Sequence, residues 1–225
     1  QGVKGGSYLV DEGLKKGEVD TLKKGWEIVQ RNQRKISDLA WDMLSFSKER
    51  RPEALAANLN HVVEDVSDLL EFRAGNEGTA LVVDGLTGNA EFVFDADAIH
   101  RALLNITVNA LDAVMDNPNG EVRIAIEHDA GHGTLQIEVA DNGPGIPESE
   151  RERIFQPFVS DKGNRGTGLG LAVSRKILRE HDGDIVIASN TSSGTKFNLM
   201  WPAVSSVELA EKLRESSVVD QNKLI

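Results

Sequence analysis

The chain has 225 residues, with 25 Lys and Arg against 36 Asp and Glu, so its formal net charge is −11. Hydrophobic residues make up 40% of it, charged residues 27%, and there is no cysteine. This composition is typical of a globular protein and excludes a disordered, collagenous or disulfide-stapled chain. The lack of cysteine excludes a thiolate metal site. The negative charge argues against nucleic acid as a partner, because binding it requires Lys and Arg to neutralise phosphates.

Apolar runs in the chain fall short of the roughly 20 residues that a membrane-spanning helix needs. We therefore expect no membrane segment in this chain and a cytoplasmic location. Because the chain begins with Gln1, without the shape of a signal peptide, we interpret it as a fragment of a longer protein.

The charge is unevenly distributed, and the change predicts a domain boundary. Residues 1–51 carry 11 basic and 8 acidic residues, a balance of +3, whereas residues 52–225 carry 14 and 28, a balance of −14. The change coincides with Pro52, and proline disfavours helix at the residue before it. We expect a helical region at 1–51, a main domain at 52–203, and a short helix and tail at 204–225.

The first region has the pattern of a long amphipathic helix from Thr21 to Arg50. Apolar residues recur every seven positions, as at Val29, Ile36 and Met43, which predicts a helix packed on other helices. An earlier helix would end near Gly17. Either one helix lies on the main domain, or a helical hairpin dimerises into a four-helix bundle; we favour the hairpin because the apolar stripe is long.

After Pro52, short strands alternate with helices. Helical patterns occupy residues 59–70, 98–115 and 171–180, and strand patterns occupy residues 80–84, 91–94, 122–126, 135–139, 185–188 and 197–201. Strands grouped with intervening helices, with a probable hairpin among them, predict an α+β fold, a two-layer sandwich of helices on a sheet.

Three polar residues share one face of the helix expected at 98–115. Asn105, Asn109 and Asp112 are spaced i, i+4 and i+7, so their side chains stack on the same side. An asparagine oxygen is a hard, neutral ligand suited to Mg²⁺. Taken alone, a solvated polar face explains these residues better than a metal site does.

A turn rich in glycine and proline follows the strand at 135–139. In Asp141-Asn-Gly143-Pro-Gly145, the glycines let a flat ligand approach the backbone, and Asp141 offers an acceptor to an exocyclic amine. An ordinary turn, in which the aspartate caps its own backbone, is about as good an explanation of this segment alone.

A second glycine-rich loop, Gly166-Thr167-Gly168-Leu169-Gly170, runs into the helix at 171–180. Backbone N–H groups at a helix N-terminus favour an anion such as phosphate, and Lys162 and Arg165 lie just upstream. The loop lacks the strand of a dinucleotide-binding fold and the Gly-Lys-Ser/Thr of a P-loop, so alone it is weak evidence. Before it, Phe155 and Phe158 precede a polar stretch, a pattern typical of a lid on a hydrophobic anchor.

Taken in order, these features resemble the ATP-binding domain of the sensor histidine kinases, in the superfamily shared with gyrase, the mismatch-repair ATPases and ATP-dependent chaperones. The resemblance covers about residues 55–202 and implies the Bergerat-type ATP-binding fold. Its five motifs are Asn105-Ile-Thr-Val-Asn109-Ala-Leu-Asp112-Ala113, Asp141-Asn-Gly143-Pro-Gly145-Ile, Ile154-Phe155-Gln-Pro-Phe158, Gly166-Thr167-Gly168-Leu169-Gly170-Leu and Gly194-Thr195.

The resemblance implies ATP and Mg²⁺ as cofactors and assigns roles to matching residues. Asn109 would coordinate Mg²⁺, and Asn105 would lie near the γ-phosphate and orient the nucleophile. Asp141 would accept from the adenine amino group, with support from Thr195. The other expected nucleotide-binding residues are Asp112, Gly143, Gly145, Lys162, Arg165, Gly166, Thr167, Gly168, Leu169 and Gly170. Asp112 departs from the family, because many sensor kinases carry Lys or Arg there, and the motif resembles that of nitrogen-regulator-type kinases.

Residues 1–51 resemble the second half of a dimerisation and phosphotransfer domain, which implies a homodimer through these helices and a response-regulator receiver domain as partner. The acceptor histidine of such a domain lies on its first helix, and none of the histidines at 61, 100, 128, 132 and 181 lies there. We therefore expect the acceptor upstream of Gln1. The alternative function is an ATP-driven conformational clamp, or an ATP-binding regulatory module, that transfers nothing to protein.

Overall fold

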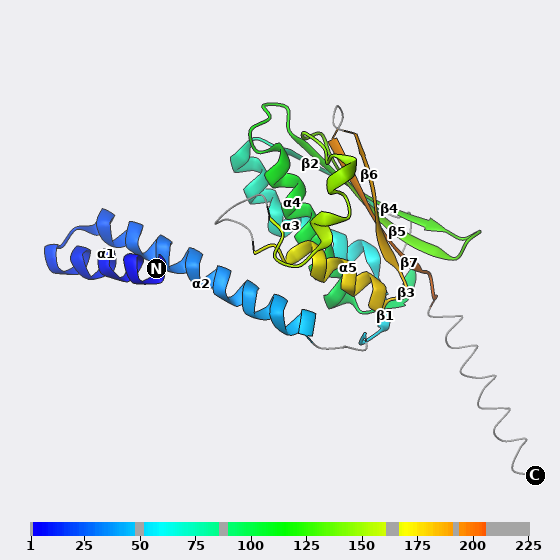
Figure 1. Cartoon of the computed structure of the whole chain (residues 1–225), viewed down its shortest axis with the longest axis horizontal. Coiled ribbons are helices and arrows are strands. Elements are labelled where there is room, and N and C mark those ends of the chain that lie inside the picture. The colour runs from blue at the N-terminus through cyan, green and yellow to red at the C-terminus, as the bar shows by residue number, and fades with distance from the viewer. Residues whose placement is uncertain (1, 48–51, 86–89, 161–166, 191–193, 206–225) are drawn as a thin grey trace, which may run out of the picture.

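The structure, a computed structural model, describes residues 2–47, 52–85, 90–160, 167–190 and 194–205. It consists of an N-terminal helical hairpin that projects from an α/β body (Figure 1). The hairpin helices are α1 (Gly2–Lys16) and α2 (Val19–Ser47), joined at Gly17, whose φ of 68° suits a residue without a side chain. The expected arrangement of two helices ahead of the body is therefore confirmed.

Glycines bring the two helices of the hairpin into close contact. A Cβ atom on Gly25 of α2 would lie 2.6 Å from the Val10 backbone nitrogen and 2.8 Å from the Gly6 carbonyl oxygen of α1. Some apolar side chains, such as Val29, also lie at this contact, whereas other large apolar residues of the hairpin are exposed. The large apolar residues of the described hairpin that are more than half exposed are Tyr8, Leu14, Val19, Trp26, Ile36 and Met43.

Five strands form the main sheet in the order β2-β4-β5-β7-β6. β2 and β4 are parallel, and the other neighbours are antiparallel. The bounds are β2 (Ala80–Asp84), β4 (Glu121–Asp129), β5 (Thr134–Asp141), β6 (Asp184–Asn190) and β7 (Gly194–Pro202). The central strand β5 ends at Asp141, which is paired with Thr195 at the start of β7.

Three helices cover one face of this sheet: α3 (Leu59–Glu77), α4 (Ala96–Val114) and α5 (Gly170–Glu180) (Figure 1). Helix α4 packs against both α3 and α5 and against β4 and β5. The hydrophobic core fills the space between helices and sheet, and α5 also contacts α2 of the hairpin. Two short 3₁₀ turns, η1 (Glu148–Glu150) and η2 (Arg153–Phe155), lead from β5 towards α5.

This architecture confirms the expected two-layer α+β sandwich. One pair of strands was not expected from the sequence. Strand β3 (Glu91–Phe94) lies outside the main sheet and pairs with β1 (Leu55–Asn58). Strand β1 was not predicted, because Leu55 and Ala56 are exposed and no buried alternation marks this strand. The helix expected in the C-terminal tail lies outside the described residues. In the described parts of the chain, no helix has both the length and the apolarity to cross a membrane.

Candidate functional site

Helix α4 presents three polar side chains opposite its buried face. Its apolar residues, including Ile99, Leu103 and Ile106, are fully buried, as the sequence predicts. Asp95 caps the N-terminus of the helix, and its Oδ1 accepts a hydrogen bond 3.0 Å long from the Ala98 N–H. Because the buried face fixes the rotation of the helix, Asn105, Asn109 and Asp112 lie along the wall of a cavity.

Asp141, the last residue of β5, is a buried acid on another wall of the same cavity. Its Oδ1 accepts hydrogen bonds from the backbone N–H groups of Gly143, at 2.9 Å, and Thr195, at 3.3 Å. Burial raises the pKa of the Asp141 carboxyl above its ordinary value, and these two hydrogen bonds offset part of the rise. The side chain is thus held in one orientation, as an acceptor facing a largely apolar slot.

Gly194 makes this orientation possible. It has a φ of 92°, and a Cβ atom at this position would overlap the Asp141 carbonyl oxygen. Only glycine lets β7 approach β5 closely enough for Thr195 to reach the Asp141 carboxylate.

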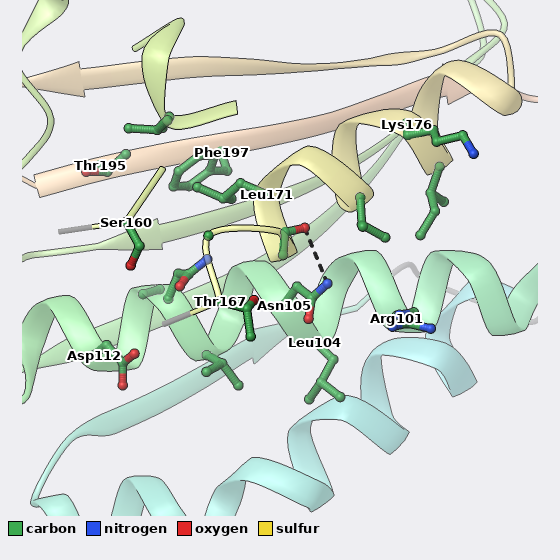
Figure 2. Close-up of a pocket in the computed structure, with 18 of the residues that line it drawn as sticks. Arg101, Leu104, Asn105, Asp112, Ser160, Thr167, Leu171, Lys176, Thr195 and Phe197 are labelled. Carbon is green, nitrogen blue, oxygen red and sulfur yellow. Dashed lines mark hydrogen bonds between the residues drawn. The ribbon is translucent and has the colours of Figure 1, made fainter. Parts of the chain in front are cut away.

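The second glycine-rich loop meets α4 where α5 begins. The Asn105 side-chain amide donates a long hydrogen bond, 3.4 Å, to the Gly170 carbonyl oxygen (Figure 2). Gly168 has a φ of 67°, and its carbonyl accepts from the Phe158 N–H at 2.8 Å. The first N–H groups of α5, like those of any α-helix, have no partner within the helix, and Leu169 at the N-cap position provides no capping side chain. These N–H groups belong to the first turn of α5, which includes Gly170 and Leu171, and both residues line the cavity.

These elements enclose one cavity of about 880 Å³ between α4, α5 and the ends of β5 and β7. In Figure 2, Asp112 and Thr195 lie towards one end of it, and Arg101 and Lys176 lie towards the other, with Asn105 and Thr167 between them. The expected site residues that line it are Asn105, Asn109, Asp112, Asp141, Gly145, Thr167, Gly168, Gly170 and Thr195. Segments that are far apart in the sequence thus converge as the sequence motifs suggest.

Two of the expected residues that the structure describes, Gly143 and Leu169, are not among those that line the cavity. Gly143 lies behind Asp141, where a Cβ atom would approach the Ala113 carbonyl oxygen at 2.9 Å. The Leu169 side chain is buried in the core, so only its backbone faces the loop. Lys162, Arg165 and Gly166 lie outside the described residues.

Asp112 has a partner that the sequence analysis did not foresee. Its carboxylate forms an ion pair with the Arg73 guanidinium of α3, which also contacts Glu77 at 2.9 Å. A link between residues 39 positions apart carries no local sequence signal. Arg101, in contrast, lies four residues before Asn105 and lines the cavity, so the same helical spacing would have found it.

Comparison with known proteins assigns the chain to a family. Residues 94–205 match the model of the histidine kinase-, DNA gyrase B- and HSP90-like ATPases. The chain is also 31% identical to the catalytic domain of the histidine kinase ThkA, covering 68% of this chain and 99% of that one, with a TM-score of 0.60. The chain belongs to this ATPase family. It contains an ATP-binding ATPase domain of the histidine kinase type.

Longer relatives share the sequence beyond the ATPase domain. The sensory histidine kinase/phosphatase NtrB of Rhizobium leguminosarum bv. phaseoli is 30% identical over 196 residues, which cover 81% of this chain and 50% of that protein. ThkA in complex with the response regulator TrrA matches at 26% identity and a TM-score of 0.66, over 89% of this chain and 58% of that one. The chain spans half or less of the length of the first curated relatives it matches.

The raised pKa of Asp141 predicts a stability effect with a defined pH dependence. Because the folded state holds this proton more tightly than the unfolded state, the ionised carboxylate destabilises the fold above the raised pKa. Asp141→Asn keeps an acceptor for Gly143 and Thr195, so it should raise the free energy of unfolding at pH 7. The gain should disappear as the pH falls below the ordinary aspartate pKa, where both states are protonated.

Urea denaturation at a series of pH values measures this difference. Asp116→Asn, at an exposed position after α4, is the control and should leave stability nearly constant. A less stable Asp141→Asn protein, with the same deficit at every pH, would contradict the assignment.

Proposed function

We propose that this chain is the catalytic region of a sensor histidine kinase, which transfers the ATP γ-phosphoryl group to a histidine outside these 225 residues and thence to a response regulator. The observation that carries the proposal is the single cavity that joins the acceptor Asp141 to the amides of Asn105 and Asn109. A response-regulator partner is supported by the complex of the similar kinase ThkA with TrrA. A cytoplasmic location is part of the proposal, because the reaction consumes ATP.

The proposed nucleotide lies with its adenine at Asp141 and its phosphates along α4 towards α5. The adenine amino group would donate to Asp141, and Thr195 would hold that carboxylate in place. The phosphates would meet the N–H groups of the first turn of α5 and the small residues Gly168 and Gly170. We also assign phosphate contacts to Lys162 and Arg165, which lie outside the described residues.

Asn109 is the proposed ligand of a magnesium ion. The described residues contain no group of three or more His, Asp or Glu side chains able to hold a metal. A neutral amide oxygen on the cavity wall fits Mg²⁺, which takes few protein ligands and is otherwise held by phosphates and water. When bound, the ion would neutralise charge on the phosphates, which the acidic body cannot do.

In the transfer step, a histidine ring nitrogen forms a bond to the γ-phosphorus while the bond from that phosphorus to the β–γ bridging oxygen breaks and ADP leaves. Such a step needs mainly alignment and charge stabilisation. Asn105, on the same helix face as Asn109, is the residue we assign to orient the nucleophile and the γ-phosphate.

Within the chain, the five histidines lie outside the hairpin helices. His61 is exposed on α3, His100 lines the cavity, and His181 is hydrogen-bonded between α4 and α5. His128 packs against Phe92, and His132 pairs with Asp129 in the β4–β5 turn. This distribution supports an acceptor elsewhere in the full protein. The rival function, an ATP-driven clamp or regulatory module, needs no acceptor.

Labelling with γ-³²P-ATP separates the two functions. A longer protein that includes the upstream sequence should acquire acid-labile, base-stable label on one histidine, whereas the 225-residue chain should bind Mg-ATP without labelling itself. ATP turnover by the longer protein without any protein-bound label would support the clamp, and label mapped to His100 by mass spectrometry would refute an acceptor outside the chain.

Asn109→Ala tests the metal assignment. In Mg²⁺ the substitution should weaken ATP binding at least about tenfold, equivalent to about 1.4 kcal/mol, because a metal ligand is lost. In EDTA the loss should be less than about twofold. Calorimetric titration of both proteins with and without Mg²⁺ measures the difference. Asn119→Ala, in the exposed loop after α4, is the control; an equal loss with and without Mg²⁺ would mean that Asn109 does not hold the metal.

We also propose that the hairpin mediates homodimerisation. Its internal contact is made largely through glycine, while an apolar stripe including Trp26, Ile36 and Met43 is left more than half exposed. A long apolar stripe of this kind is typical of a helix that packs on a partner.

Sedimentation equilibrium of the chain should give about twice its mass of 24.5 kDa. Ile36→Arg places a charge on the stripe and should shift the mass to that of one chain. Ser37→Arg introduces the same charge at a neighbouring exposed position and should leave the dimer intact. Monomeric wild-type protein at about 50 µM, well above the Kd of an ordinary dimer, would contradict the proposal.

A further inference from the structure

Asp95 is a buried carboxylate that uses both of its oxygens, and only 3% of its surface is exposed. Oδ1 accepts the Ala98 N–H at the first turn of α4. Oδ2 accepts the Glu53 N–H at 2.9 Å, from a residue 42 positions earlier. Glu53 lies at the point where the described chain enters the body from the hairpin, directly after Pro52.

The backbone of Asp95 makes a third connection, to the end of α5. Its N–H donates to His181 Nε2 at 3.1 Å, and His181 Nδ1 lies 2.8 Å from the Ile177 carbonyl oxygen. Because Nε2 accepts, the ring proton is on Nδ1, where it donates to Ile177. The chain leaving the hairpin, the start of α4 and the end of α5 are therefore joined at one residue.

This junction belongs to the cavity described above. Pro52, Asp95 and His181 line the same cavity as Asn105, Asn109 and Asp141. Helix α4 runs from Asp95 to the asparagines without a break, and an α-helix is stiff over this length, so a displacement of its first turn is carried to both amides. A shift of the chain at Glu53 is thus mechanically linked to a shift of the Asn105 and Asn109 side chains.

We propose that Asp95 is a positioning residue that couples the helical hairpin to the nucleotide site. Its carboxylate holds the incoming chain and the first turn of α4 together, so the hairpin orientation and the placement of Asn105 and Asn109 depend on each other. The coupling rests on the proposed nucleotide site, whereas the tie between Glu53 and Asp95 does not.

Two substitutions break the tie at different ends. Glu53→Pro removes the N–H donor without altering Asp95, and Glu53→Ala is its matched control, because it removes the same side chain and keeps the N–H. Asp95→Ser retains an oxygen that caps α4 but has no second oxygen for Glu53. Glu53→Pro and Asp95→Ser should therefore both remove the hydrogen bond between residues 53 and 95, one by losing the donor and the other by losing the acceptor.

The hairpin orientation is measured first, without nucleotide. The chain has no cysteine, so Lys24→Cys on α2 and Glu127→Cys on β4, both exposed, allow site-specific spin labelling. Excess unlabelled chain restricts the measured distances to one molecule. Wild type and Glu53→Ala should give one narrow distribution. Glu53→Pro and Asp95→Ser lose the tie between the incoming chain and α4, while the contact between α2 and α5 is not altered directly, so their distributions should be at least twice as wide.

Amide exchange of Glu53 is measured second, with a non-hydrolysable ATP analogue and Mg²⁺. Coupling is reciprocal, so nucleotide should slow exchange of this amide at least threefold in wild type and Glu53→Ala and leave it unchanged in Asp95→Ser. If Asp95 had only a structural role, nucleotide would not change the exchange rate of the residue 53 amide.

The outcomes separate this inference from the proposed function. A distribution for Glu53→Pro as narrow as that for Glu53→Ala would overturn the tie, whether or not nucleotide binds. An analogue that binds but leaves Glu53 exchange unchanged in wild type would overturn the coupling and leave the nucleotide site standing. An analogue that does not bind wild type would overturn the proposed function instead.

Discussion

The geometry of the site depends on how α4 is packed. The helix is held on one side by the core and by α3 and α5, so its polar face has no freedom to rotate. The Ser174 hydroxyl of α5, fully buried, donates to the Gly170 carbonyl at 2.9 Å, inside the interface between α4 and α5. Close packing of this kind transmits small shifts instead of absorbing them. The positions of Asn105 and Asn109 therefore depend on the packing of the buried residues on the opposite face of α4.

Charge is the second constraint, because an acidic body is proposed to bind an anionic ligand. Asp112 stands where many of the kinases that the chain resembles carry a basic residue, yet Arg73 from α3 forms an ion pair with it. The pair is partly exposed, so its contribution to stability is small. Its effect on the local field is larger, since it cancels a negative charge beside the cavity. Arg101 and Lys176 at the far end add positive charge that the composition alone does not reveal.

Local patterns predicted most of the fold, and long-range contacts account for what was missed. The helix α4 and the strands β4 and β5 followed from periodicity, because their burial repeats at the helix or strand period. The motifs also identified residues that line one cavity, such as Asn105, Asp141 and Gly168. Periodicity could not show that β1 pairs with β3 outside the main sheet, or that Arg73 reaches Asp112. Those contacts depend on how the helices and strands pack against one another, and the sequence of a single segment does not determine this packing.

The fixed orientation of Asp141 has a consequence for selectivity between purines. Two backbone N–H groups hold Oδ1, so the ionised side chain can accept hydrogen bonds but offers none. Guanine carries a carbonyl oxygen where adenine carries its amino group, and it would place one lone-pair-bearing atom against another at a buried side chain. Rejection of GTP would then come from repulsion at Asp141, the same side chain that is proposed to accept a hydrogen bond from adenine.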